Sequence, residues 1–464
     1  MNNEIITTLN AIFYPKTLAV IGASNREGNF GLMFTRGFIE MGFKRLYIVH
    51  PKEEDVLGIN AYPRVVDIPD EIDLAVVTTP LKTVTQVIRE CVDKGVKGVI
   101  IFTSGFREYS PEGKVHENEI LNIARQGKMR IIGPNCMGIY CPASRLSIFS
   151  GMPKDGGSVG MISHSGSLSM MLTLAMIRYG IGFSKVVSCG NECDLNAIDF
   201  LEYYGQDTDT KIIIAYLESI KDGARFCRLA KDITKKKPII IWKGGTTERG
   251  AMAASSHTGA MAISGDIWRA VVNQSGIIPA QSIEDIVDYL QTFYYLPLPN
   301  GNRVVIISGP GGPAVGTTDA CIDAGLELAK ISSDTQKRIS ETIPSVGTSI
   351  KNPIDLGMGS GFFPEWYTKS IKALVEDDSV DILLLIGSRL DNSFCEEVSN
   401  LVKKSGKPVA LITMPGLDEM SRHNKPVDGL AIYSDGRRAA MALGKLVSYA
   451  ASLEKINTYS RKHS

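Results

Sequence analysis

A chain of 464 residues with 44% hydrophobic and 22% charged residues has the composition of a folded enzyme and, at roughly 150 residues per domain, has room for about three domains. Its 50 basic and 50 acidic residues leave no net charge, which argues against nucleic acid or an acidic membrane as a partner. Its apolar runs are too short to span a bilayer, it has no secretory signal pattern, and its eight cysteines form no C-x-x-C pair, so we expect a cytoplasmic protein with reduced thiols and no metal site of its own.

Residues 1–145 alternate short apolar runs with helical patterns. Strands are predicted at residues 18–21, 46–49, 74–77 and 98–102, with a helix at about 31–41 after the first of them. This rhythm is typical of a doubly wound, nucleotide-binding parallel sheet. Proline-bearing connectors at 141–157 and 296–302 interrupt the apolar periodicity and predict domain boundaries near residues 145 and 298.

The remaining chain repeats the same rhythm twice. Residues 146–298 carry predicted strands at 159–162, 212–216 and 239–242, and residues 299–464 carry strands at 304–307, 382–386 and 409–412. The predicted fold class is therefore α/β, with a Rossmann-like domain followed by two flavodoxin-like domains that have parallel sheets.

A glycine-rich loop follows the first strand, but its spacing differs from that of an NAD site. The glycines are Gly22, Gly28 and Gly31, in place of G-x-G-x-x-G. The amides at the next helix start can still hold a phosphate. After the second strand stands Lys52, where an NAD site has an acidic residue, and a lysine there suits a phosphate on the ribose, as in coenzyme A.

A run of small residues surrounds His257. Residues 250–260 read GAMAASSHTGA, which predicts an exposed, mobile loop rather than a packed strand or helix. Neutral histidine is a nucleophile toward phosphorus, and its ordinary pKa near ~6.5 keeps that form plentiful. Taken alone, a histidine in a loop is more often an ordinary surface residue.

Two further segments complete a phosphoryl-holding site around His257. Glu218 ends a predicted strand, at the carboxyl edge where α/β sites assemble, and is placed to orient the histidine. The turn after residue 162 offers hydroxyls and free amides at a helix start, and we expect phosphate to be held there by Ser163, Ser165, Gly166 and Ser167.

Residues 254–260, ASSHTGA, closely resemble the phosphohistidine loop of the α subunit of ADP-forming acetyl-CoA synthetases, a family related to succinyl-CoA synthetase. Further matching segments follow in family order, at 20–24, 104–108, 132–138, 163–166, 216–223 and 352–356. The resemblance implies a reversible reaction in three stages. Phosphate converts acyl-CoA to acyl phosphate and CoA, His257 takes the phosphoryl group, and ADP receives it to become ATP.

The resemblance also assigns roles to individual residues. Glu218 orients His257, and Asn135 and Cys136 lie near the thioester, although a glycine-proline-asparagine sequence is also an ordinary tight turn. The residues implied for coenzyme A are Gly22, Ser24, Lys52, Pro80, Ser104 and Glu108.

Two departures from the family pattern stand out. His164 occupies a position of the phosphate turn where glutamine or arginine is expected, so it can accept a proton or compete as the nucleophile. The glycine-proline loop at 308–313 also differs from the family form.

No G-x-x-x-x-G-K-[ST] loop and no ATP-grasp-like stretch occurs in the sequence. By resemblance, a separate ATP-grasp β subunit supplies the ADP/ATP and Mg²⁺ site and a second helix start, in an α2β2 assembly.

Two other functions remain open at this stage. The first is a CoA-binding regulatory or scaffolding protein without ligase activity, for which the pair of His257 and Glu218 has no use. The second is a nicotinamide-dependent dehydrogenase, which Lys52 and the glycine spacing oppose. The acyl group is not indicated, and acetate or another small carboxylic acid is the default.

Overall fold

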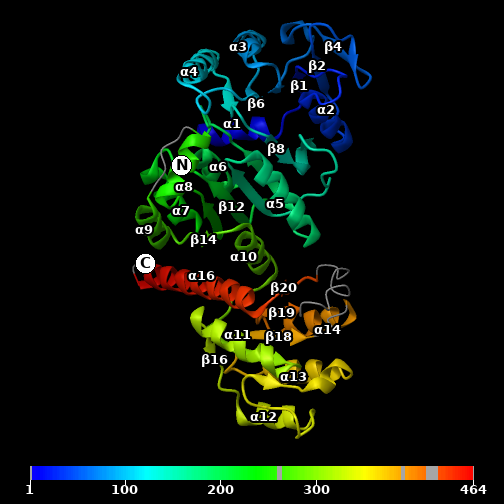
Figure 1. The fold of residues 1–464 in the computed structure, drawn as a ribbon, viewed down its shortest axis with the longest axis vertical. Helices are drawn as coiled ribbons and strands as arrows, with labels where there is room; N and C mark the ends of the chain where they lie inside the picture. Colours follow the sequence, from blue (N-terminus) through cyan, green and yellow to red (C-terminus); the bar gives the residue numbers. More distant parts are fainter. Residues whose placement is uncertain (1–2, 259–263, 388–391, 414–426, 463–464) are drawn as a thin grey trace. The chain divides into compact units, whose positions relative to one another are not determined.

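The computed structural model describes residues 3–258, 264–387, 392–413 and 427–462, without the side chains of residues 3, 255–258, 392 and 457–462 (Figure 1). The chain divides into two compact units, one formed by residues 1–177 and 182–281 and the other by 178–181 and 282–464. None of the described helices is long and apolar enough to cross a membrane.

The first sheet confirms the predicted Rossmann-like domain. Its strand order is β3-β4-β2-β1-β5-β6-β7, and all neighbours are parallel except β3 and β4. The strands are β1 (Leu18–Ile21), β2 (Leu46–Val49), β3 (Asp55–Val56), β4 (Ile59–Tyr62), β5 (Leu74–Val77), β6 (Gly98–Ile101) and β7 (Arg130–Ile132). The helices around them are α1 (Asn3–Phe13), α2 (Phe30–Met41), α3 (Leu81–Lys94) and α4 (Pro111–Gln126).

Local sequence explains where α2 begins and ends. The Asn29 side chain accepts the N–H of Leu32 at 2.8 Å, which satisfies one unpaired donor of the first turn. Gly42 ends the helix with φ 86, a left-handed conformation that glycine adopts without steric cost. The helix start is therefore held directly after the loop that follows β1.

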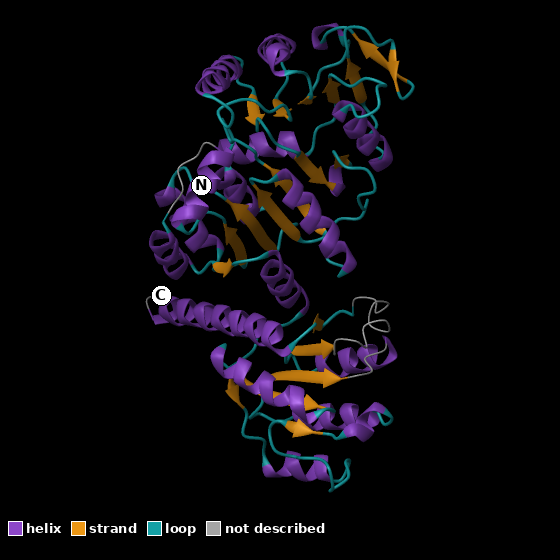
Figure 2. Ribbon diagram, viewed as in Figure 1, coloured by secondary structure: helices purple, strands orange, loops and turns teal. Residues whose placement is uncertain are grey.

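The second sheet lies in the same unit and is flavodoxin-like. Its order is β14-β13-β12-β10-β11-β8-β9, with β10 to β14 parallel and β8 and β9 antiparallel at one edge. Helices lie in front of and behind its strands (Figure 2). The strands are β8 (Gly138–Cys141), β9 (Leu146–Ser147), β10 (Val159–Ser163), β11 (Phe183–Ser188), β12 (Ile212–Leu217), β13 (Ile239–Lys243) and β14 (Ile278–Ala280). The helices are α5 (Gly166–Arg178), α6 (Ala197–Gln206), α7 (Gly223–Ile233), α8 (Glu248–Thr258) and α9 (Gly265–Ser275).

The expectation of a loop around His257 is wrong for the part that the structure describes. The backbone of 248–258 forms α8, while 259–263 lie outside the described residues. The reason is intrinsic propensity: Ala251, Ala253 and Ala254 are the best helix formers, and the segment contains no proline. Small side chains rule out a packed core face but do not prevent a helix.

The third sheet makes up the core of the second unit. Its order is β16-β15-β18-β19-β20, with β17 also paired to β15, and every one of these pairs is parallel. The strands are β15 (Arg303–Ser308), β16 (Glu327–Leu328), β17 (Ile354–Asp355), β18 (Ile382–Gly387), β19 (Val409–Thr413) and β20 (Leu430–Tyr433). The helices are α10 (Ile283–Tyr295), α11 (Gly311–Asp323), α12 (Ser333–Ser340), α13 (Glu365–Val375), α14 (Asn392–Lys403) and α16 (Gly436–Lys462).

The predicted domain boundaries at residues 145 and 298 stay predictions. The strands β8 and β9, on either side of the first boundary, both belong to the second sheet. Before the second boundary, α10 packs on α16, where Asp288 accepts two hydrogen bonds from Arg438 at 2.6 and 2.8 Å. These contacts tie α10 to the chain that follows it.

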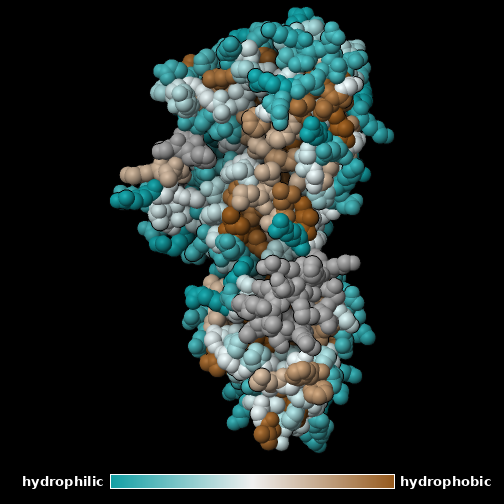
Figure 3. Space-filling model, turned by 45° about the vertical axis from the view of Figure 1, so that its right-hand side comes forward, coloured by the Kyte–Doolittle hydropathy of each residue, from teal (hydrophilic) through white to brown (hydrophobic). Residues whose placement is uncertain are grey.

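Part of the surface is apolar. Figure 3 shows hydrophobic side chains gathered in patches on one face. Exposed large hydrophobic residues include Met171 and Leu174 on α5, three positions apart on one face of that helix, and Phe30 and Met33 on α2. Patches of this kind often mark surfaces that bind another protein.

Candidate functional site

A cavity of about 880 Å³ opens at the carboxyl ends of β1 and β5. The chain leaves these neighbouring strands in opposite directions, which is where ligands bind in open α/β sheets. Four residues predicted to bind coenzyme A line it: Gly22, Ser24, Pro80 and Ser104. A methyl group on Gly31 would lie 2.6 Å from Cα of Ala23, so only glycine lets α2 approach the loop this closely.

The arginine and histidine side chains that line the cavity were missed by sequence reasoning. Arg26, His50 and Arg64 face the same cavity, and the two guanidinium groups are the residue type that binds phosphates best. Arg26 lies inside the glycine loop, where its charge was a usable signal. Arg64 and His50 come from other segments and only the fold brings them there.

Two predicted CoA residues lie elsewhere in the structure. Lys52 is exposed and does not line the cavity, although its backbone N–H donates to Nδ1 of His50 at 3.2 Å. One carboxylate oxygen of Glu108 accepts the N–H of Gly105 at 2.6 Å, and the other accepts the amide of Asn191 at 2.6 Å. Glu108 therefore fastens its own turn to the loop after β11.

The predicted thioester residues lie where the first two sheets meet. The Pro134 carbonyl accepts the N–H of Asn191 at 2.9 Å, which joins the turn of Asn135 to the loop after β11. Cys136 is 3% exposed, and burial raises the pKa of its thiol to about 12. The thiol is therefore a neutral packing group at physiological pH, and the proximity of both residues to a thioester stays a prediction.

The second group of predicted residues lies at the carboxyl ends of β10 and β12. In the order β14-β13-β12-β10-β11, the chain continues from β10 to its neighbour on one side and from β12 to its neighbour on the other. The two connections therefore diverge between β10 and β12, which is where ligands bind in such sheets. The Ser163 hydroxyl donates to the Ser165 carbonyl at 2.7 Å, and the Ser165 hydroxyl accepts the Leu168 N–H at 3.3 Å. The first amides of a helix have no partner within it, so the turn presents the start of α5 as a place for an anion.

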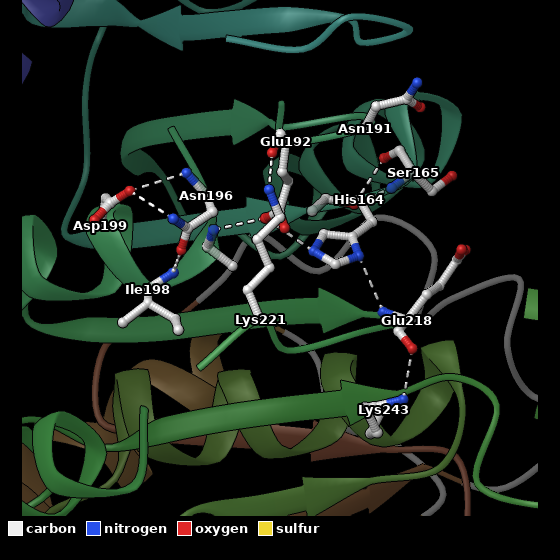
Figure 4. Close-up of polar contacts among 12 residues, drawn as sticks. His164, Ser165, Asn191, Glu192, Asn196, Ile198, Asp199, Glu218, Lys221 and Lys243 are labelled. Carbon is white, nitrogen blue, oxygen red and sulfur yellow. Dashed lines mark hydrogen bonds and ion pairs between the residues drawn. The ribbon is translucent and has the colours of Figure 1, made fainter. Parts of the chain in front are cut away.

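Glu218 follows β12 directly and is 4% exposed. Its N–H donates to Nδ1 of His164 at 3.1 Å, and its carbonyl accepts Nζ of Lys243 at 2.8 Å (Figure 4). Its carboxylate accepts the Tyr216 hydroxyl at 3.1 Å. Side chains from β12, from β13 and from the residue directly after β10 thus hold Glu218 at the sheet edge.

Glu192 is a buried carboxylate that sequence reasoning missed. Its Oε1 lies 3.1 Å from Nε2 of His164 and accepts the Ala197 N–H at 2.6 Å, while Lys221 donates to its carbonyl. Burial alone would raise the pKa of Glu192, but the imidazole, the ammonium and the amide together hold that pKa below its ordinary value. Glu192 is therefore ionised at neutral pH.

Lys243 is a second buried ion at this edge. It is 4% exposed, and desolvation lowers its pKa to about 8, against the attraction of the Glu218 carboxylate. Its ammonium also donates to the carbonyl of Gly244. A lysine held this way is a cation that loses its charge near physiological pH.

The backbone of His257 lies in the last turn of α8, and its side chain lies outside the described residues. The helix begins five residues after β13, the strand next to β12. The predicted pairing of His257 with Glu218 therefore stays a prediction. No cluster of three or more metal-ligating side chains occurs among the described residues.

Comparison with known proteins identifies all three domains. Residues 16–142 match the CoA binding domain, residues 156–293 the succinyl-CoA ligase like flavodoxin domain, and residues 304–389 the ligase-CoA domain. The three matches follow the three sheets in order.

Relatives with names match nearly the whole chain. It is 38% identical to the α subunit of ADP-forming acetate–CoA ligase II of Pyrococcus furiosus, over 95% of this chain and 98% of that one. It is 37% identical to an ADP-forming 4-hydroxybutyrate–CoA ligase of Nitrosopumilus maritimus, over 89% of this chain but 60% of that longer one.

A solved structure matches equally broadly. The dinucleotide forming acetyl-coenzyme A synthetase 1 of Candidatus Korarchaeum cryptofilum, in complex with phosphate and ADP, gives a TM-score of 0.86 at 32% identity, covering 97% of this chain and 98% of that one. The chain therefore belongs to the family of α subunits of ADP-forming acetate–CoA ligases.

Proposed function

We propose that this chain, with a β subunit, interconverts acyl-CoA, ADP and phosphate with a carboxylic acid, CoA and ATP through a phosphohistidine at His257. The observation that carries the proposal is the buried Glu218 beside the start of α5, at the reversal point of the second sheet. A positioned carboxylate and a phosphate-holding helix start are what a phosphorylated histidine needs.

The reaction divides into three balanced steps. Phosphate attacks the thioester carbonyl and the C–S bond breaks, which gives acyl phosphate and CoA. A neutral ring nitrogen of His257 then attacks phosphorus, and the bond from phosphorus to the acyl oxygen breaks to release the acid. ADP finally attacks the phosphohistidine, which yields ATP and restores the free imidazole.

Each group has a stated task in these steps. The Glu218 carboxylate accepts a hydrogen bond from the ring N–H of His257 and so leaves the other nitrogen free to attack. The helix start at Ser165 to Ser167 holds the transferred phosphoryl group by its amides. The cavity beside β1 fits coenzyme A in volume and in its two arginines, Arg26 and Arg64.

We further propose an ATP-grasp β subunit, which binds ADP or ATP with Mg²⁺, and an α2β2 assembly. The α-subunit name of the Pyrococcus relative and the greater length of the Nitrosopumilus relative support a partner. The apolar residues Met171 and Leu174 on α5 offer a surface for it. Eight free cysteines suit the reducing conditions of the cytoplasm.

The acyl group of this chain is proposed to be acetate or another small acid. The named relatives act on acetate and on 4-hydroxybutyrate at almost equal identity, 38% and 37%. A panel of short acids, assayed for CoA- and ATP-dependent thioester formation, selects among them.

The decisive experiment labels the protein with ATP that carries a radioactive γ-phosphate, together with Mg²⁺ and the partner subunit. We expect an acid-labile, base-stable label on the wild type that is lost in His257→Ala. The matched control is His116→Ala, because that histidine is exposed on α4 and should keep the label. No label on the wild type with the partner present, or label that survives in His257→Ala, contradicts the proposal.

A further inference from the structure

The backbone of Glu218 stands one residue beyond the end of its strand. β12 ends at Leu217, yet the N–H and the carbonyl of Glu218 are both satisfied, the first by His164 and the second by Lys243. These two residues stand at the ends of β10 and β13, the strands on either side of β12. Their side chains thus extend the hydrogen bonding of the sheet by one residue.

The contacts of His164 decide where its proton lies. Nδ1 faces the N–H of Glu218, which can only donate, so Nδ1 is an acceptor without a proton. Nε2 faces Oε1 of Glu192, which also accepts the Ala197 N–H and so acts as an acceptor, so Nε2 carries the proton and donates. The ring is therefore a neutral imidazole with both nitrogens in use.

The same contacts bear on whether His164 can be phosphorylated. The nucleophilic atom of a neutral imidazole is its unprotonated nitrogen, which here is Nδ1. That lone pair accepts the Glu218 N–H at 3.1 Å, and the side chain is only 2% exposed. An attack on phosphorus would require the ring to leave its site and strand two buried polar groups.

We propose that His164 is a positioning residue, which holds the Glu218 backbone so that its carboxylate can orient the reacting histidine, and that His164 is not itself phosphorylated. The inference rests on the proposed function, because it assigns His164 a task through Glu218. The sequence leaves two roles open for His164, proton acceptor and nucleophile. This inference assigns it neither of them.

The test compares two replacements that divide the contacts of the ring. In His164→Asn, Oδ1 can take the place of Nδ1 and accept the Glu218 N–H, whereas His164→Leu keeps the bulk and loses both bonds. With the partner subunit present, we expect His164→Leu to slow phosphorylation of the chain about 100-fold, the size of loss that a misplacement of about 1 Å can cause. His164→Asn should recover most of that loss.

Two further readouts separate positioning from loss of structure. Both variants should bind CoA with unchanged Kd and show a lower kcat at an unchanged KM for CoA, because the CoA cavity belongs to the first sheet. The double variant His164→Leu with Glu218→Gln should be no slower than Glu218→Gln alone, since His164 acts through Glu218. Multiplied losses in the double variant would show an independent role and overturn the inference.

The outcomes also distinguish this inference from the proposed function. If Glu218→Gln keeps the wild-type rate, the proposed role of Glu218 fails, and the role of His164 fails with it. If Glu218→Gln is slow while His164→Leu is as fast as the wild type, only the inference fails. Label found on His164 in the His257→Ala variant would refute it directly.

Discussion

Replacing the buried Lys243 by methionine should change how the stability of the second domain depends on pH. The ammonium donates to the carbonyls of Glu218 and Gly244, and burial lowers its pKa from 10.5 to about 8. At about 1.4 kcal/mol for each pKa unit, the folded state carries a penalty of about 3 kcal/mol for the charged form.

The sign follows from proton binding. Below about pH 8 the lysine is charged in both the folded and the unfolded chain, and the penalty is present in full. From there to pH 10.5 the unfolded chain binds more protons, so stability rises with pH until both states are neutral. The free energy of unfolding of the wild type relative to Lys243→Met should therefore increase by about 3 kcal/mol across this range.

Urea unfolding monitored by tryptophan fluorescence measures this difference. Trp242 precedes the lysine and Trp268 lines a cavity beside it, so a Trp366→Phe background removes the signal of the other unit. The ionisation of groups that the wild type and Lys243→Met share cancels in the difference between their free energies of unfolding. Lys235→Met is the matched control, because Lys235 pairs on the surface with Asp232. If the free energy of unfolding of the wild type minus that of Lys243→Met stays constant within about 0.5 kcal/mol across this pH range, Lys243 is not desolvated, which refutes the reasoning.

Two other predictions concern packing and charge in the first unit. Gly31→Ala places a methyl group 2.6 Å from the backbone of the glycine loop. We therefore expect this variant to bind CoA about 10-fold more weakly, as measured by calorimetric titration. The control is Gly316→Ala, whose added methyl group meets nothing within 4 Å and which should bind CoA normally. Lys185→Met leaves the carboxylate of Asp207, 2.7 Å from the lost ammonium, without its cation and should lower the free energy of unfolding by about 3–5 kcal/mol in urea. Lys235→Met should cost less than about 1 kcal/mol, and an equal loss in both lysine variants would contradict the buried pair.

The sequence predicted to within a residue or two those parallel strands that are short, uninterrupted apolar runs, several of which end in a glycine or serine turn. Examples are β1, β10 and β15. The internal parallel strand β11 and the strands β8 and β9 at the sheet's edge were not predicted. β8 is paired by contacts with β11, and β9 by contacts with β8, which local sequence does not contain. The small residues around His257 suggest a mobile loop by their size, but their alanines favour helix, and the structure has α8 there.

The candidate site was predictable only where one segment carries the chemistry. Ser165 stands in the turn after β10 and Glu218 directly after β12, so their place at the sheet edge followed from the pattern. Glu192 gave no such signal, since its left-handed backbone with φ 56 and its contact with His164 arise from the fold. Arg64 likewise reaches the cavity beside β1 from the turn after β4, more than thirty residues further along the chain than the glycine loop.

The second and third domains build their first turn in the same way and differ in one position. At the end of β10 the Ser163 hydroxyl donates to the carbonyl two residues on, at 2.7 Å, and at the end of β15 the Ser308 hydroxyl does the same at 2.6 Å. The next residue is His164 in one turn and Gly309 in the other, where a methyl group would lie 2.4 Å from the Ser360 hydroxyl. The third domain has no room for an imidazole at this position. The two turns are thus built alike and differ in a single side chain, and of the two, the turn after β10 is the one that holds a carboxylate residue with a histidine.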